Sequence, residues 1–174
     1  MQVQLDLIKK LREKSSASIS DCRNALVEAG QDIDKAVLIL RRRGMELADK
    51  KQDRVSKEGR IEAYVHAGNK IGVLLEVNSE TDFVARNSDF CQFTKNVAMQ
   101  IAACSPAYIR REDVPAEIAK EQASLDEYCK QSCLMEQPFI KDPSLTIKDL
   151  LADLITKIGE NIVIRRYTRY KTGE

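Results

Sequence analysis

The side chains best suited to nucleophilic or metal chemistry in this chain are one histidine, His66, and five cysteines. A thiolate beside an imidazole is the pair that cysteine enzymes use, but nothing in the sequence places a cysteine next to His66. Cys129 and Cys133 stand four residues apart and supply at most half of a zinc site. We therefore predict no catalytic residue, metal or cofactor. The cysteines are expected to be small apolar side chains in a reducing compartment: Cys22, Cys91, Cys104, Cys129 and Cys133.

The sequence also lacks the usual motifs for binding phosphate and shows little sign of a nucleic-acid-binding surface. Neither a GxxxxGK[ST] nor a GxGxxG loop occurs, so the chain has no visible means of holding a nucleotide by itself. With 28 basic and 27 acidic residues, no overall field would draw it onto nucleic acid or an anionic membrane. The arginines at 41–43 suit the C-terminal end of a helix, and those around 165–171 alternate along a strand as a solvated face would.

No apolar run approaches the roughly 18 residues that would span a bilayer. The first residues, MQVQLDLIKKLREK, lack the apolar core and cleavage site of a secretory signal. We expect a cytoplasmic protein that binds neither membrane nor nucleic acid directly.

The segment Thr81-Asp82-Phe83-Val84 is the unusual feature of the sequence. Ser79 and Thr81 can cap a helical turn directly after a strand, which would make the segment project from the end of a sheet. An acid followed by phenylalanine on such a projection is typical of an interface anchor, because interfaces are enriched in aromatic residues. The alternative is that Phe83 and Val84 pack on the following helix beside Phe90, and the spacing alone leaves both open.

The elements that would position this segment form an α+β protein. Residues 1–45 show three short amphipathic helices, with starts at Ser18 and Asp32 and stops at Gly30 and Gly44. Residues 46–59 are charged without a sustained apolar period and are predicted to be a linker. Residues 60–174 form the core domain.

Within that domain the period changes to two. Ile61, Ala63 and Val65 alternate with polar neighbours, and after Gly68-Asn69 the run 71–77 alternates again, which predicts a hairpin. Helical patterns follow, including one that begins at a Thr146/Asp149 capping box, while PFIKDPS (138–144) is predicted to be a loop. The stretch 161–170 reads as a third strand, so we expect a three-stranded antiparallel sheet packed by helices.

Four ordered motifs carry a resemblance to the elongation factor Ts family. LEVNSETDFVARNSDF is similar to the family's LEVNCQTDFVA, and residues 7–44 resemble its LRxxTGAGxMDCKxAL and DIExAxxxLRxxG. IGENIVIRR and QPFIKDPSLTIKDLL resemble IGENIxxRR and QPFVxDPSxTVxxLL. The resemblance covers nearly the whole chain.

The resemblance implies a guanine-nucleotide exchange factor for the GTPase elongation factor Tu, with no bond chemistry of its own. It implies that Asp82 and Phe83 enter the GTPase near its magnesium site, with Thr81 and Val84 shaping the turn. It further implies that the N-terminal, ubiquitin-associated-like (UBA-like) three-helix module docks on the nucleotide domain. That contact maps to Leu11 and Ile19. His66, in YVHAGNKIGVL, matches a partner-touching histidine of the family.

The chain departs from the family pattern in one motif and in length. TGAGMMDC is SSASISDC here, with Ser16 and Ser18 where glycines are usual and Ser20 at the second Met position. The long form of the family repeats the core domain and divides His66 and Asp82-Phe83 between its repeats. This chain has one core unit and places them in one hairpin, so it resembles the short form, and we expect a homodimer.

Three other functions stay open from the sequence. The three-helix module is similar to ubiquitin-associated domains, which would suit a ubiquitin-type adaptor. A cysteine-dependent enzyme using His66 and an RNA-binding factor are the others, ranked in that order behind the exchange factor.

Overall fold

The computed structural model describes residues 3–15 and 17–174, so the departure at Ser16 lies outside the described residues. Its internal contacts divide the chain into two units. The first comprises the residues up to Arg54 together with Ala152–Asn161, and the second comprises Val55–Leu151 and Ile162–Glu174. The division after Arg54 falls within the segment 46–59. The sequence did not indicate that 152–161 joins the first unit, and independent folding of 1–45 and 60–174 stays a prediction.

The first unit begins with three helices: α1 (Leu5–Ser15), α2 (Ile19–Glu28) and α3 (Ile33–Lys51). The predicted caps form, because the Ser18 side chain accepts from Asp21 N at 3.1 Å and Asp32 Oδ1 accepts from Lys35 N at 3.0 Å. Such caps satisfy amides that the first turn of a helix leaves unbonded. The apolar faces of the helices meet in a small core: Ile8, Leu11, Ala17, Cys22, Ala25, Leu26, Ala36 and Leu40.

Gly44 does not end the third helix, and the prediction of a stop there is wrong. α3 continues through Gly44 to Lys51, so the first part of the expected linker is helical. A Cβ added at Gly44 would lie 2.8 Å from Thr156 Oγ1, in the part of α8 (Ile147–Ile158) that belongs to this unit. The glycine therefore allows two helices to approach closely, which a sequence pattern alone does not distinguish from a stop.

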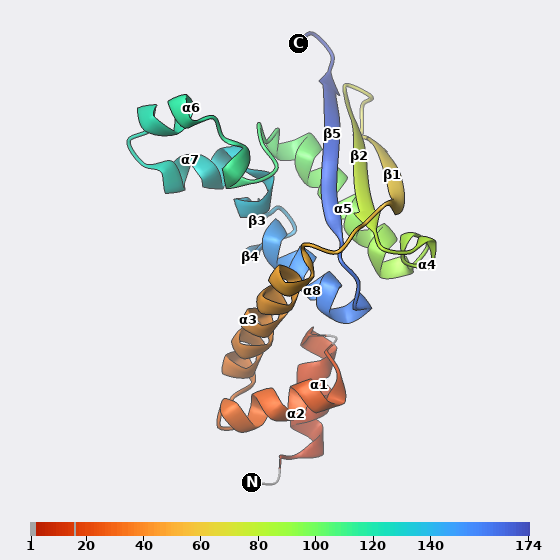
Figure 1. Cartoon of the computed structure of the whole chain (residues 1–174), viewed down its shortest axis with the longest axis vertical. Helices are drawn as coiled ribbons and strands as arrows, with labels where there is room; N and C mark the ends of the chain where they lie inside the picture. Colours follow the sequence, from red (N-terminus) through yellow and green to blue (C-terminus); the bar gives the residue numbers. More distant parts are fainter. Residues whose placement is uncertain (1–2, 16) are drawn as a thin grey trace. The chain divides into compact units, whose positions relative to one another are not determined.

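The second unit is built on a three-stranded antiparallel sheet, as the sequence predicts. Its strands are β1 (Glu58–Val65), β2 (Ile71–Ser79) and β5 (Val163–Lys171), in the order β1-β2-β5 (Figure 1). Gly68 and Asn69, with φ of 90° and 55°, make the turn of the predicted hairpin, because a tight β-turn of this kind requires positive φ.

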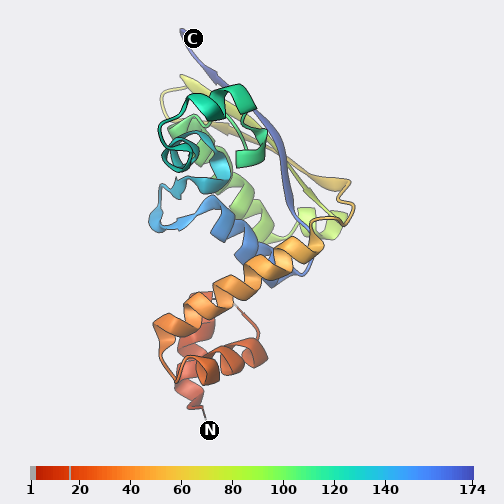
Figure 2. The ribbon, with the colours of Figure 1, turned by 60° about the vertical axis from the view of Figure 1, so that its left-hand side comes forward.

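Helices cover one face of this sheet and leave the other exposed. Val73, Leu75 and Val77 of β2 are buried beneath α5 (Ser88–Cys104), which runs along the sheet (Figure 2). Glu62 is the register partner of Leu75, so the covered face of β1 carries polar side chains. The alternating apolar residues of β1 consequently point away from the helices: Ile61, Ala63 and Val65 are exposed.

The remaining elements of the second unit are short. α4 (Asp82–Ala85) follows β2, and α6 (Ala116–Glu121) and α7 (Leu125–Ser132) precede a two-stranded ribbon of β3 (Pro138–Phe139) and β4 (Asp142–Thr146). Short 3-10 turns occupy Arg111–Asp113 and Leu134–Glu136. The predicted loop at PFIKDPS is thus a small ribbon, and its prolines exclude helix as expected. Within residues 3–15 and 17–174, none of the helices has the length and apolar content needed to cross a bilayer.

We predict that Gly44→Ala destabilises the chain although alanine favours helix. Helix propensity gains about 1 kcal/mol, whereas overpacking against a rigid neighbour costs about 1–3 kcal/mol. Thr156 Oγ1 is held by a 2.8 Å hydrogen bond to Ala152 O, so it cannot give way freely. Urea unfolding should show a net loss in the wild-type background and none in a Thr156→Ala background. Stabilisation in both backgrounds would contradict this account of Gly44.

Candidate functional site

The segment Thr81–Val84 forms a single helical turn at the end of β2, which we call the tip. Thr81 occupies the N-cap position with extended φ and ψ of −126° and 156°. The Ser79 hydroxyl donates to Thr81 O at 2.9 Å, and Arg86 N donates to Phe83 O at 3.2 Å. Asn87 then caps α5, since its Oδ1 accepts from Asp89 N at 2.8 Å. The tip is therefore held at its entry and at its exit.

Phe83 projects from this turn into solvent. Its side chain is 81% exposed, whereas Val84 and Phe90 are buried. The alternative in which Phe83 packs beside Phe90 is therefore wrong. Burial of Val84 anchors the turn while the neighbouring ring stays free of the protein's own core, because the two side chains leave the turn in different directions.

Asp82 adjoins the exposed ring and is paired with Arg86. Arg86 Nη2 donates to Asp82 Oδ2 at 2.9 Å across one turn; the arginine side chain is exposed and that of Asp82 is about half exposed. Exposed pairs of this spacing contribute only about 0.3–0.5 kcal/mol, so a partner with a stronger demand for the carboxylate can displace the arginine. The sequence analysis did not single out Arg86, although the i, i+4 spacing of opposite charges was a usable signal.

His66 lies at the other end of the hairpin from the tip. It follows β1 directly, and its Nδ1 is 3.0 Å from the Tyr64 hydroxyl. The nine residues of β2 separate the turn at 68–69 from the tip, which corresponds to roughly 25–30 Å at the rise of a strand. Sharing one hairpin therefore does not bring His66 and Phe83 into one site. Figure 1 shows the turn between β1 and β2 and the α4 turn at opposite ends of the hairpin.

The two residues predicted on the three-helix module have opposite environments. Ile19, the first residue of α2, is 59% exposed and available to a partner. Leu11 is 0% exposed and forms part of the module's own core. The prediction that Leu11 contacts a partner is wrong, because its side chain has no surface to offer in the folded module.

The cysteine thiols are free, and three of them are buried: Cys22, Cys129 and Cys133. Burial raises the pKa of Cys133 to about 12, with a further contribution from neighbouring Cys129, so this thiol stays protonated at neutral pH. Burial also raises the pKa of Cys104. Over the described parts of the chain, no group of three His, Cys, Asp or Glu side chains is arranged to hold a metal ion.

The tip carries an exposed phenyl ring beside a carboxylate on a turn that is held at both ends. Transfer of an apolar ring from water into a pocket lowers the free energy of the system. Because the backbone that carries the ring is already fixed, little conformational entropy is lost on binding. The second unit thus combines an α+β fold with an exposed aromatic side chain on a turn that is held at both ends.

Comparison with known proteins gives the family. Residues 2–127 match the family model described as Elongation factor TS. The elongation factor Ts of Alkaliphilus oremlandii is 47% identical over 197 aligned residues, spanning 100% of this chain and 91% of the relative. That of Thermotoga petrophila is 48% identical over 195 residues, spanning 100% and 98%. The chain belongs to the elongation factor Ts family of translation elongation factors.

We predict that truncating Leu11 and Ile19 has very different effects on stability. Leu11→Ala leaves a cavity in the module's core and should destabilise it by about 2–5 kcal/mol. Ile19→Ala removes exposed atoms and should change the free energy of unfolding by less than about 0.5 kcal/mol. Urea unfolding followed by circular dichroism measures both. Equal effects would mean that the burial assigned to these side chains is wrong.

Proposed function

We propose that this chain is a guanine-nucleotide exchange factor that binds elongation factor Tu and promotes release of GDP. The observation that supports this most directly is the exposure of Phe83 on a turn pinned at both ends. Membership of the elongation factor Ts family supports the choice of partner. The chain would act in the cytoplasm with the rest of translation, without touching nucleic acid itself.

In this proposal the tip enters the GTPase near its magnesium site, with Phe83 lodged in an apolar pocket between helices. An exchange factor and a nucleotide weaken each other's binding by the same factor, because the coupling free energy is reciprocal. Burial of one phenyl ring supplies about 1.5–3 kcal/mol, and each tenfold loss of nucleotide affinity needs about 1.4 kcal/mol. One ring can therefore account for about one to two orders of magnitude of nucleotide release.

Asp82 would add an electrostatic contribution. A carboxylate brought close to a magnesium site competes for the metal or for the groups that order it, since Mg²⁺ prefers oxygen ligands in strict geometry. Loss of the metal leaves the phosphates with uncompensated charge. Exchange of the Arg86 pair for contacts in the GTPase would then free Asp82 from its own protein. No proton transfer is required of either residue.

The three-helix module would supply affinity through docking on the nucleotide domain of the GTPase. Its exposed Ile19 is the residue that we place in this contact, in place of the buried Leu11. His66 stays assigned to a partner contact away from the tip.

We predict that Phe83→Ala lowers the stimulation of GDP release by about 10- to 100-fold, the equivalent of the lost ring burial. Stopped-flow release of a fluorescent GDP analogue from elongation factor Tu measures the rate. Because Phe83 is exposed, the variant should unfold at the wild-type urea concentration. Ile140→Ala is the control, since it truncates an exposed apolar side chain elsewhere in the same unit. Equal rates for wild type and Phe83→Ala would rule out the tip mechanism, and no acceleration by wild type would rule out the function.

We also propose that two copies of the chain associate through the open face of the sheet. Apolar side chains gather on this face, in the positions that alternate with the buried ones: Ile61, Ala63, Val65, Leu74 and Tyr170. The same face carries the ion pair of Arg166 Nε with Glu76 Oε2 at 2.6 Å, and a two-fold axis would place this face of one copy against the same face of the other. A dimer would also present His66 from one copy and the tip from the other, which one copy holds at opposite ends of a strand.

We predict that Leu74→Glu converts a dimer into a monomer, because it places a charge in the centre of the open face. Light scattering should report twice the 19.7 kDa mass of one chain for wild type and the mass of one chain for the variant. Leu38→Glu makes the same change on an exposed leucine of α3 and should leave the dimer intact. A wild-type monomer at working concentration would remove the dimer from this proposal.

A further inference from the structure

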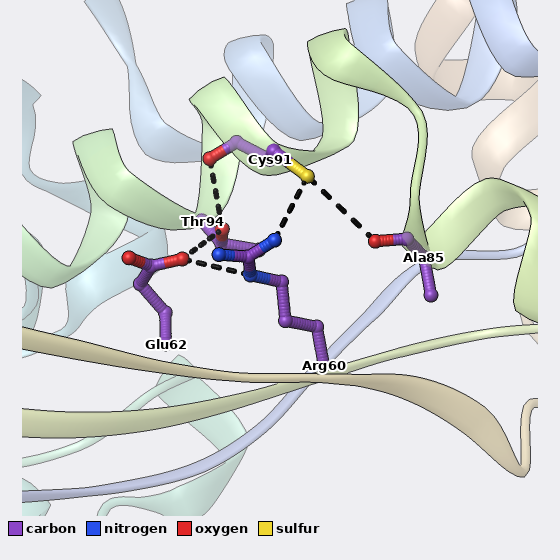
Figure 3. A network of polar contacts seen from close by, with 5 residues as sticks. All are labelled: Arg60, Glu62, Ala85, Cys91 and Thr94. Atoms are coloured by element: carbon purple, nitrogen blue, oxygen red, sulfur yellow. Dashed lines mark hydrogen bonds and ion pairs between the residues drawn. The ribbon is translucent and has the colours of Figure 1, made fainter.

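A network of charged and polar side chains lies between β1 and α5 on the covered face of the sheet (Figure 3). Arg60 Nε donates to Glu62 Oε2 at 2.9 Å, and Thr94 Oγ1 lies 3.1 Å from the same carboxylate oxygen. Arg60 Nη1 donates to Cys91 Sγ at 3.0 Å, and Cys91 Sγ donates to Ala85 O at 3.7 Å. The contacts therefore run from β1 through α5 to the last residue of the α4 turn.

This network occupies positions where a covered sheet face ordinarily carries apolar side chains. Glu62 is 7% exposed, while its apolar neighbours Ile61 and Ala63 face solvent. The pair is part-buried, with the Arg60 side chain 36% and the Glu62 side chain 9% exposed, and desolvation of the carboxylate offsets much of the attraction. Its hydrogen bonds are directional, however, and they restrict the elements that carry them to one arrangement. We therefore explain the Arg60–Glu62 pair by the element whose orientation it fixes.

The element that it orients is α4. A helix of four residues cannot hold its geometry alone, because nucleating a turn costs more than its few hydrogen bonds return. Burial of Val84 and Ala85 attaches the turn to the core, but apolar contact does not specify direction. The hydrogen bond from Cys91 to Ala85 O adds that direction, and Arg60 in turn holds the sulfur.

We propose that Arg60, Glu62 and Cys91 are positioning residues that fix the orientation in which the tip presents Phe83 and Asp82 to the GTPase. They act through α4 and not by contact with the partner. The proposal rests on the exchange function proposed above and adds to it the residues that preorganise the site. Preorganisation favours binding because less conformational freedom is lost on association.

The test replaces the ion pair by apolar residues of similar volume, in the double variant Arg60→Met/Glu62→Leu of the full chain. Its stability should stay close to that of wild type, because both charges are removed together. Its second-order rate constant for release of a fluorescent GDP analogue from elongation factor Tu should fall by about tenfold, the equivalent of about 1.4 kcal/mol. The control is Arg111→Met/Glu136→Leu, which removes another part-buried pair of the same unit, bonded at 2.8 and 2.9 Å.

A second readout needs no partner. Hydrogen exchange of the Arg86 and Asn87 amides, which bond to Phe83 O and Val84 O, reports how firmly the turn is held. These amides should exchange several-fold faster in the double variant and at the wild-type rate in the control. Faster exchange together with slower GDP release supports the proposal. Unchanged amide exchange, unchanged GDP release, or an equal loss in the control overturns it.

A conservative pair covers the case in which the double variant does not fold. Cys91→Ser keeps a group that accepts from Arg60 Nη1, which lies 3.0 Å from the sulfur, and it should retain GDP release within about twofold of wild type. Cys91→Ala removes both hydrogen bonds and should lose several-fold. Equal behaviour of the two overturns the proposal. If wild type itself fails to accelerate release, the exchange function fails, and the amide exchange still decides whether the network holds the turn.

Discussion

The candidate site depends on one condition: a phenyl ring is exposed to solvent while the backbone that carries it is held in place. Phe83 leaves the α4 turn toward solvent, and the next side chain, Val84, enters the core. A ring exposed on a loose loop would lose much of its binding energy to ordering, and a ring on a rigid but buried turn would reach no partner. Hydrogen bonds at Ser79 and Asn87 allow both conditions to hold together.

The rest of the second unit can be understood as the support for that turn. β2 ends where the tip begins, and its buried face is held by α5, so the strand provides a fixed starting point. β1 turns a charged pair inward and thereby bonds the helix that follows the tip. The same orientation of β1 exposes Ile61 and Val65, and these side chains form part of the apolar face that we propose to bind a second copy. One arrangement of β1 thus links the orientation of the tip to the proposed association of two chains.

Much of the fold could be predicted because its signals are local. Gly68-Asn69 adopts the positive φ values of a hairpin turn, and Thr146 and Asp149 form the reciprocal capping box, with bonds of 2.8 and 3.1 Å. The tip was also recognisable as an unusual motif, since its residues are contiguous, but its spacing left open whether Phe83 is exposed or buried. The close approach at Gly44, the burial of Leu11 and the outward face of β1 depend on contacts between distant segments. Period and spacing do not contain that information, and the network around Arg60 was missed for the same reason.

The most direct test follows the ring itself. The chain has four phenylalanines, of which Phe83 is exposed and Phe90, Phe93 and Phe139 are buried. After incorporation of 4-fluorophenylalanine, fluorine NMR should show one solvent-accessible resonance, which Phe83→Leu removes. On addition of nucleotide-free elongation factor Tu, that resonance should shift and lose its solvent accessibility, with much smaller changes in the other three. If the complex forms while the Phe83 resonance keeps its position and its exposure to solvent, the ring does not enter the GTPase and the account is contradicted.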